Sequence, residues 1–336
     1  MKYHIITYGC QMNKADSKRI ASGLERKKYK SAQNINEADL IVVNMCSVRQ
    51  PAVDRIFGLI QKFKKIKKKK KIKTILTGCV LKKDLKKLKE GFDSIWEQDK
   101  DFNCPPEYYS SKIAYIPISN GCNNFCSYCV VPYTRGKLIC RDHKKILEEI
   151  KRAVKKGVKE IWLLGQNVND YKSSKDKKIN FSKLFRLIDE IPGKFKIFFM
   201  SPHPKNFSDE LIKTLAESKH FSRYLNLPVQ SGDNIILKKM NRPYTVKNYK
   251  DLVKKIRKAM PDINLSTDVI VGFPGETKKQ FKNTEKLFKE IKFNIAYINK
   301  YSPREGTVSF NLKDGVPFKE KKEREQSLIK IANIHE

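Results

Sequence analysis

Short apolar runs alternate with charged segments of helical periodicity through the N-terminal part of the chain. The apolar runs predict strands at residues 3–8, 39–45 and 72–77, and the segments between them predict helices at residues 13–30 and 51–63. Strands that alternate with helices form parallel sheets. We therefore expect an α/β fold that begins with an open parallel-sheet domain over residues 1–96.

The same alternation resumes on a longer repeat after residues 97–111, whose Pro105-Pro106 pair and polar composition predict a linker. Strands are expected at residues 113–118, 160–164, 196–200, 224–227, 264–272 and 294–300, and helices at residues 143–156, 181–190, 207–218, 246–258 and 278–291. Six strand–helix units predict a partial (β/α)6 barrel of the TIM type over residues 112–310, with its chemistry at the C-terminal mouth. Residues 311–336 are expected to form a helical extension.

Length and composition indicate a globular protein. The 336 residues are 40% hydrophobic, which is enough to build one large or two modest cores and excludes a disordered chain. The first residues lack the apolar stretch and cleavage site of a signal peptide, and no segment approaches the roughly 18 apolar residues of a membrane span. We expect a cytoplasmic protein without a membrane partner.

The chain is strongly basic, with 71 Lys and Arg against 36 Asp and Glu, a formal net charge of +35. Such a field favours a polyanionic partner, because neutralising nucleic-acid phosphates releases counterions. A compositional bias toward Lys, unrelated to binding, is the alternative. The charge predicts a nucleic-acid partner.

Three cysteines lie close together directly after the first predicted barrel strand. Cys122, Cys126 and Cys129 are separated by three and then by two residues. Cubane iron–sulfur clusters are normally held by four thiolates, so a set of three predicts a cluster with one iron open to a ligand. Zinc is the main alternative, although its structural sites usually show paired Cys-x-x-Cys or Cys/His knuckles. Unliganded core cysteines are the third possibility.

Another cysteine stands at the end of each predicted strand of the first domain, namely Cys10, Cys46 and Cys79. Ligands of open parallel sheets gather beyond the carboxyl ends of the strands, so these three thiols are expected to converge. Strand-end cysteines are often only small buried hydrophobes. Their occurrence on all three strands, beside Gly or Asn, favours a second metal site.

The chain resembles the methylthiotransferases of the radical S-adenosylmethionine (SAM) superfamily, most closely those that modify tRNA. The resemblance covers residues 3 to about 310. Its motifs lie at residues 8–13, 44–49, 77–79, 121–136, 164–169, 227–232, 267–276 and 301–307. Together these motifs are highly specific.

This resemblance implies an enzyme with two [4Fe–4S] clusters. Cys122, Cys126 and Cys129 match the ligands of a radical-generating cluster whose open iron chelates SAM, and reductive cleavage of SAM then gives a 5′-deoxyadenosyl radical. The other three thiols match the ligands of an auxiliary cluster that provides or carries sulfur. A second SAM would methylate that sulfur. The protein itself would supply position and exclusion of water.

The resemblance also implies side chains around SAM. Gln166 and Asn167 match the place where the SAM amino group is bound, and Gln230, Ser266 and Asp268 lie where contacts to ribose and carboxylate are expected. Arg135 would neutralise a carboxylate or a phosphate. The ordinary alternatives are turn caps for the amides and a surface ion pair for the arginine.

Other residues are expected to have structural roles or none at these sites. Cys104 and Cys140 fit no ligand position, and Trp96 and Trp162 are expected in the core. His203 faces the barrel mouth, where a structural role and a substrate contact are equally compatible with the sequence.

The implied reaction adds a methylthio group to carbon 2 of N6-isopentenyladenosine beside the tRNA anticodon. The implied partners are the anticodon stem-loop and an electron donor such as flavodoxin or ferredoxin. The enzyme itself is expected to be a monomer. Relatives that modify threonylcarbamoyladenosine or a ribosomal-protein aspartate share this chemistry and remain alternatives. A metal-containing RNA-binding protein is the non-enzymatic alternative. We also expect the C-terminal RNA-binding TRAM domain of such enzymes to be absent, with a diffuse basic surface holding tRNA instead.

Overall fold

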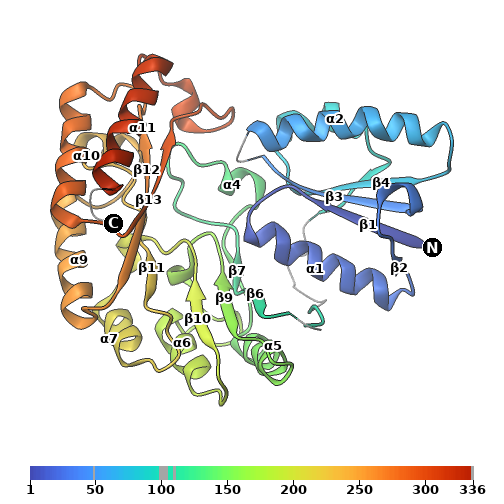
Figure 1. Ribbon diagram of the computed structural model, residues 1–336, viewed down its shortest axis with the longest axis horizontal. Coiled ribbons are helices and arrows are strands. Elements are labelled where there is room, and N and C mark those ends of the chain that lie inside the picture. Colours follow the sequence, from blue (N-terminus) through green and yellow to red (C-terminus); the bar gives the residue numbers. More distant parts are fainter. Residues whose placement is uncertain (48–49, 98–104, 109–110, 334–336) are drawn as a thin grey trace.

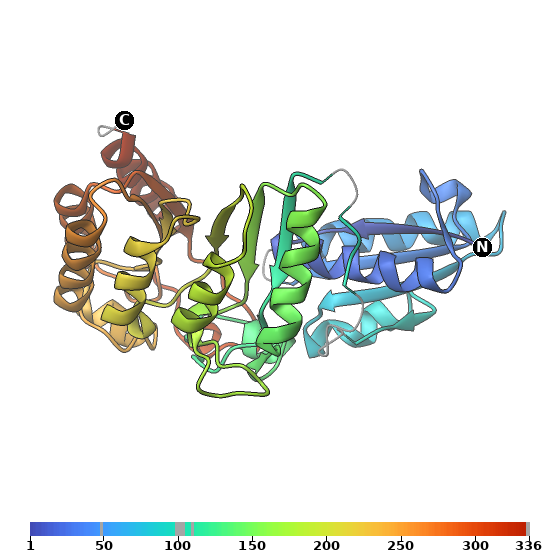
Figure 2. The same cartoon turned by 90° about the horizontal axis from the view of Figure 1, so that it is seen from below.

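The computed structural model describes residues 1–47, 50–97, 105–108 and 111–333 (Figure 1). The molecule has two units, an N-terminal sheet with its helices and a C-terminal barrel-like array. They lie at opposite ends of the molecule in both views (Figures 1 and 2). The predicted order of an open parallel sheet followed by a partial barrel is confirmed. Cys104 and part of the motif at residues 44–49 lie outside the described residues.

The N-terminal unit is a five-stranded parallel sheet with the order β2-β1-β3-β4-β5. Its strands are β1 (Lys2–Thr7), β2 (Lys30–Ser31), β3 (Leu40–Cys46), β4 (Lys73–Cys79) and β5 (Ser94–Ile95). The helices are α1 (Gln11–Arg26), α2 (Gln50–Lys67), α3 (Leu85–Lys89), η1 (Ile35–Glu37) and η2 (Lys82–Asp84). The three predicted strands are present, and the two-residue edge strands β2 and β5 were not predicted.

Every residue of the central strand β3 is buried, which explains its continuous apolar run. Ile41 and Val43 pack with Ile56 and other residues of α2, whereas Val42 packs on the opposite face with Leu24 of α1. Alternate side chains of β3 therefore pack against α2 on one face of the sheet and against α1 on the other, so the strand lies between the two helices.

The second unit is built from two three-stranded parallel sheets, β10-β9-β6 and β11-β12-β13. A parallel bridge between Ile197 and Phe221 joins them, which continues the array across the predicted third and fourth strands. The strands are β6 (Ile113–Pro117), β9 (Glu160–Leu164), β10 (Lys196–Phe199), β11 (Tyr224–Asn226), β12 (Asn264–Val271) and β13 (Ile295–Lys300). All six predicted barrel strands are present.

Helices cover the outside of this array (Figure 1). They are α5 (His143–Lys155), α6 (Phe181–Asp189), α7 (Asp209–Glu217), α9 (Val246–Ala259), α10 (Lys278–Ile291) and α11 (Phe318–Asn333). The short helix α8 (Asn234–Lys239) instead packs with Tyr128 of the cysteine loop. Leu328 of α11 is fully buried in the barrel core, so the predicted C-terminal extension packs as part of the barrel.

Shorter elements lie around the mouth. An antiparallel pair, β7 (Ser119–Asn120) with β8 (Ile139–Cys140), brackets α4 (Val131–Thr134). Single 3-10 turns follow three strands: η3 (Val168–Asp170), η4 (Pro204–Asn206) and η5 (Val308–Asn311). Residues 131–134 and 168–169 of these elements belong to the motifs.

The two units meet along α1 and β6. Met12 and Ala15 of α1 pack with Leu164 of the barrel in one apolar cluster. Beside it, the fully buried carboxylate of Glu149 binds Arg19 at 2.6 Å and Arg141 at 2.7 Å, which ties α1 to α5. Buried charges are tolerated only when they are paired in this way.

No helix in the described part of the chain is long and apolar enough to cross a membrane.

Candidate active site

The compact cysteine motif forms a loop between β7 and α4 that is fixed by backbone hydrogen bonds. The Cys122 N–H donates to the Gly136 carbonyl at 3.1 Å, and the Ser127 N–H donates to the Met240 carbonyl at 3.0 Å. Gly121 has φ +81°, and a Cβ there would lie 2.2 Å from the Lys137 carbonyl oxygen. Only glycine fits this turn, so the residue before Cys122 is dictated by the loop.

Cys122, Cys126 and Cys129 line one cavity of about 240 Å³ at the barrel mouth. Its other lining side chains include Gln166, His203 and Gln230 from loops after barrel strands, Asp268 of β12, and Arg242 from the turn between α8 and α9. Burial raises the pKa of Cys122 and raises that of Cys129 to about 12. These two thiols therefore stay protonated at neutral pH by themselves, and a cluster of irons bound here would supply the positive charge that deprotonates them.

Three of the six predicted SAM-contacting side chains reach this cavity. Gln166, Gln230 and Asp268 line it, and the Gln166 Oε1 atom accepts the Gly121 N–H at 2.7 Å, which joins the second barrel strand to the cysteine loop. Gln230 has a left-handed backbone, with φ 70°.

The other three predicted side chains lie elsewhere. Ser266 is on the same face of β12 as Asp268 but deeper in the barrel, where its hydroxyl donates to Tyr224 at 2.9 Å. Asn167 is buried beneath η4 and donates to Asn206 at 3.5 Å. Neither Ser266 nor Asn167 is among the residues that line the cavity, and Arg135 lies with the other cysteines.

Two of the strand-end cysteines, Cys46 and Cys79, lie side by side as parallel-strand geometry requires. Cys46 and Cys79 are the last residues of β3 and β4 and are paired in the ladder, while Cys10 precedes α1. The Cys10 thiol donates to Asn13 Oδ1 at 3.4 Å, and the Asn13 amide donates to the Met45 carbonyl at 3.0 Å. Cys10 is exposed and the other two thiols are buried.

Arg135 is buried among these strand ends. The alternative of an ion pair at the surface is therefore wrong. Its Nε–H donates to the Cys79 Sγ at 3.0 Å, one terminal nitrogen donates to Asn120 Oδ1 at 2.8 Å, and the other donates to Asp16 Oδ2 at 2.9 Å. A hydrogen bond with Cys46 and the charge of Arg135 lower the pKa of Cys79 to about 6 against the effect of burial. The structure thus joins a barrel residue to the cysteines of the first unit.

Arg242 is a site residue that the sequence analysis missed. It is buried and donates to the Cys126 Sγ at 3.7 Å, to the Pro228 carbonyl at 2.8 Å and to the Tyr244 hydroxyl at 2.8 Å. The only sequence signal is a single arginine in the turn between α8 and α9. A buried arginine thus donates a hydrogen bond to a thiol of each cysteine set, Arg242 to Cys126 and Arg135 to Cys79.

His203 presents a fixed tautomer to the cavity. Its Nδ1 accepts the Lys205 N–H at 3.2 Å, so the neutral ring carries its proton on Nε2. That nitrogen is buried and has no partner within the described residues. Burial, with Arg242 and Lys205 nearby, lowers the pKa of His203 to about 2. A buried N–H group without a partner in the protein is typical of a site that binds a hydrogen-bonding ligand.

The two donor sets suit clusters of several irons. In the described ranges, no three His, Cys, Asp or Glu side chains lie close enough to share one metal ion. Each thiolate of a [4Fe–4S] cluster binds a different iron, so its ligands do not need to meet at one point. Three thiols that line one cavity, and three strand-end thiols of which Cys79 accepts from the Arg135 guanidinium, would supply the donors and the compensating charge that such clusters need.

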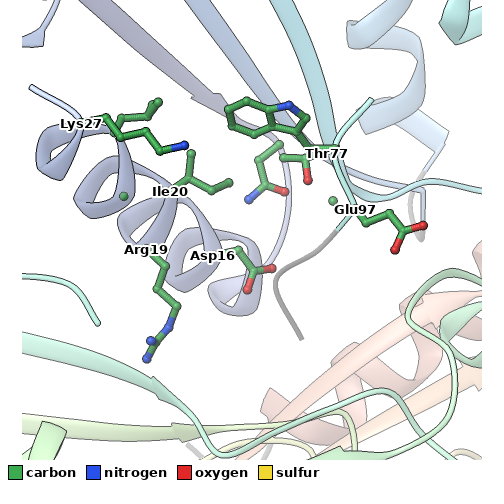
Figure 3. A pocket seen from close by; sticks show the side chains of 11 residues that line it. Asp16, Arg19, Ile20, Lys27, Thr77 and Glu97 are labelled. Atoms are coloured by element: carbon green, nitrogen blue, oxygen red, sulfur yellow. The ribbon is translucent and has the colours of Figure 1, made fainter. Parts of the chain in front are cut away.

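A further cavity of about 290 Å³ lies between α1 and the ends of β3 and β4. Asp16 and Ile20 of α1, with Lys27 directly after that helix, line one side of it, and Thr77 and Glu97 line the other (Figure 3). Trp96 also lines it and is 39% exposed, so its predicted core position is wrong. Trp162 is half-buried and stacks on Phe198 with ring centroids 4.3 Å apart.

Comparison with known families agrees with this division of the chain. The family described as the radical SAM superfamily matches residues 116–288, and the family described as uncharacterized protein family UPF0004 matches residues 2–96. A tRNA-2-methylthio-N(6)-dimethylallyladenosine synthase of Clostridium novyi (strain NT) is 40% identical over 99% of this chain and 81% of the relative. The chain belongs to the radical SAM methylthiotransferase family.

Other relatives extend this finding. The enzyme of the same name from Treponema denticola is 39% identical over 96% of this chain and 82% of its own. As a methylthiotransferase of this family, the chain uses a [4Fe–4S] cluster and SAM.

Solved structures of similar fold include the radical SAM methyltransferase TsrM from Kitasatospora setae with cobalamin and a [4Fe–4S] cluster bound. It has a TM-score of 0.64 at 12% identity and covers 92% of this chain and 77% of its own. The cobalamin-dependent radical enzyme OxsB has a TM-score of 0.62 at 12% identity, over 98% of this chain and 56% of its own. At this identity the likeness concerns the fold of both units.

Proposed function

We propose that this enzyme adds a methylthio group to carbon 2 of N6-isopentenyladenosine beside the anticodon of tRNA. The observation that carries the proposal is the pairing of two three-cysteine sites, one at the barrel mouth and one on the adjoining sheet, joined by Arg135. A single radical site is compatible with many reactions. The second site, together with the names of relatives at about 40% identity, favours sulfur insertion into tRNA.

At the barrel mouth, Cys122, Cys126 and Cys129 would hold the radical cluster. The cluster and SAM together supply a radical able to remove hydrogen from an unactivated aromatic carbon. Gln166, Gln230 and Asp268 line the cavity and would orient SAM through its polar groups. The barrel walls would exclude water from the reacting atoms.

On the first sheet, Cys10, Cys46 and Cys79 would hold the auxiliary cluster. The Asn13 amide lies within reach of Cys10 and also binds Asn44 at 2.8 Å, so it fixes the backbone from which two of the thiols project. Cys10 is the exposed member of the set. The side of the cluster near Cys10 would therefore be where sulfur and the substrate have access.

The partners follow from the reaction and the charge. We propose a monomeric cytoplasmic enzyme that takes electrons from a small donor such as flavodoxin or ferredoxin. With a net charge of +35, a diffuse basic surface would hold the phosphates of the anticodon stem-loop.

Nucleoside mass spectrometry of tRNA tests the substrate. The chain is expressed in a bacterial strain that makes N6-isopentenyladenosine and lacks its own methylthiotransferase. We expect 2-methylthio-N6-isopentenyladenosine to appear with the wild-type chain and not with Cys126→Ala. A methylthio group on threonylcarbamoyladenosine alone would assign the related activity instead, and unmodified tRNA with an iron-loaded chain would overturn the proposal.

A further inference from the structure

Arg135 stands at the junction of three segments that are far apart in the sequence. It directly follows α4, whose helix begins just after Cys129, and its guanidinium binds Asn120 beside the radical motif, Asp16 of α1 and Cys79 of β4. The residue is only 5% exposed. All three of its hydrogen-bonding groups are used, and each points to a different element.

Burial of a guanidinium is unfavourable unless its charge and its N–H groups are compensated. Asp16 compensates the charge, but it is itself only partly buried, with a side-chain exposure of 20%. The second compensating group is the Cys79 sulfur, at 3.0 Å from Nε. A donor this close to a buried sulfur serves best when that sulfur carries negative charge, as a cluster-bound thiolate does.

We propose that Arg135 is a positioning residue of the auxiliary cluster, which it holds through the Cys79 sulfur and whose reduction potential it raises. This inference rests on the proposed function, in which Cys79 is one of three cluster ligands. One-electron reduction adds a negative charge to the cluster. A fixed guanidinium beside a ligand sulfur stabilises that reduced state, and hydrogen bonds to cluster sulfurs act in the same direction.

Asp16 is expected to affect the reduction potential in the direction opposite to Arg135. Its carboxylate lies 2.9 Å from the guanidinium and offsets part of the positive charge that the cluster experiences. Loss of the Asp16 charge leaves the arginine in place with its effect enlarged. Loss of the arginine leaves the carboxylate uncompensated beside the cluster. The two changes are therefore expected to move the potential in opposite directions.

Arg141 supplies a matched control. It is a buried arginine at the same junction, 6% exposed, and its guanidinium donates to Glu149 at 2.7 Å and to the Pro117 carbonyl at 2.7 Å. Both of these acceptors are oxygen atoms, whereas Arg135 also donates to a sulfur. Substitution of Arg141 therefore disturbs a buried ion pair beside the contact between the two units, while the hydrogen bond to the Cys79 sulfur stays in place.

The test is a redox titration followed by electron paramagnetic resonance on the full chain with Cys122→Ala, Cys126→Ala and Cys129→Ala, so that only the auxiliary cluster remains. In this background we expect Arg135→Gln to shift the potential to more negative values and Arg135→Lys to shift it less, because lysine keeps the charge. Asp16→Asn is expected to shift it to more positive values. Arg141→Lys is expected to lower the thermal midpoint while the potential stays unchanged.

Each contrary result has a defined meaning. Equal potentials in Arg135→Gln, Arg135→Lys and the parent would overturn the inference and leave Arg135 a structural residue. Shifts of the same sign in Asp16→Asn and Arg135→Gln would also overturn it. If Arg135→Gln does not fold, the sign of the Asp16→Asn shift decides. An iron-free parent with Cys10, Cys46 and Cys79 intact would instead refute the second cluster, and with it both the proposed function and this inference.

Discussion

Cys46 and Cys79 occupy paired positions at the ends of the adjacent parallel strands β3 and β4, and their thiols are hydrogen-bonded to each other. The pairing depends on Gly78, whose φ of +101° turns the chain just before Cys79. A Cβ at this position would lie 2.2 Å from the Met45 carbonyl oxygen. The backbone here leaves no room for a side chain.

Gly78→Ala is therefore expected to move Cys79 away from Cys46. A left-handed conformation and a backbone clash cost roughly 1–3 kcal/mol, and we expect the auxiliary iron, about half of the total, to be lost. Iron analysis after anaerobic reconstitution and urea unfolding measure both effects. Gly58→Ala in α2 is the control, because a Cβ at this position would meet no described atom within 4 Å. It should keep full iron content and gain up to about 1 kcal/mol. Full iron in Gly78→Ala would contradict this account.

Glu149 ties the two units together through Arg19 of α1 and also binds Arg141 of its own unit. Glu149→Gln leaves two buried guanidinium groups without a counter-charge, and we expect a loss of about 3–5 kcal/mol in the free energy of unfolding. The exposed neighbour Glu148→Gln should change it by less than about 0.5 kcal/mol. Urea denaturation of both variants checks this.

The free energy of unfolding is expected to depend on pH through the carboxylate of Glu149. Burial opposes its charge, but Arg141 and Arg19 hold the pKa of Glu149 below its usual value. A lowered folded-state pKa gives stability that is fully present above the unfolded pKa of about 4.3 and is lost as pH falls below it. The difference in stability between wild type and Glu149→Gln should therefore shrink on acidification below about pH 4. A difference that grows there would contradict the ion-pair explanation.

Asp268 and Ser266 share one face of β12, but only Asp268 lines the cysteine cavity. Asp268→Asn is expected to weaken SAM binding roughly twofold to tenfold, the effect of one impaired hydrogen bond. Ser266→Ala should leave the affinity unchanged, because its hydroxyl binds Tyr224 inside the barrel. Equilibrium dialysis with the reconstituted enzyme measures both affinities. Equal losses in the two variants would show that the cavity extends deeper than its lining residues indicate.

Affinity for the anticodon stem-loop should fall steeply with salt if a diffuse basic surface binds it. Between about 50 and about 200 mM salt, six or more phosphate contacts would weaken binding by about a thousandfold or more. Filter binding measures this, with SAM binding in the same salt series as a control for cluster loss. A nearly flat salt dependence would exclude the diffuse surface.

Sequence patterns predicted the strand order along the chain because each strand is a short apolar run bounded by polar turns. They also led to the expectation that cysteines at strand ends meet, since carboxyl ends of parallel strands share one edge, and Cys46 and Cys79 do lie side by side. The edge strands β2 and β5 are too short to leave a pattern. The predicted helix at residues 13–30 ends early, at Arg26, because Lys28 adopts φ 63°.

Contacts across the junction of the two units could not be predicted from the sequence. Arg135 meets Cys79 and Asp16, which are distant in the chain, and nothing local to the Thr134-Arg135-Gly136 segment indicates those partners. The same holds for Arg242 and Cys126. Trp96 was expected in the core because tryptophan usually is, but it lies beyond the short strand β5, at the rim of a cavity.

We propose that the two cysteine sites carry out different parts of one reaction, radical formation at Cys122, Cys126 and Cys129 and sulfur supply at Cys10, Cys46 and Cys79. The most direct test of this proposal is the reconstituted chain with an isopentenylated anticodon stem-loop, SAM and a reductant, with nucleoside masses and SAM cleavage measured together. We predict methylthiolated product with wild type, SAM cleavage without product with Cys79→Ala, and neither with Cys126→Ala. Product from Cys79→Ala, or SAM cleavage by Cys126→Ala, would contradict the account.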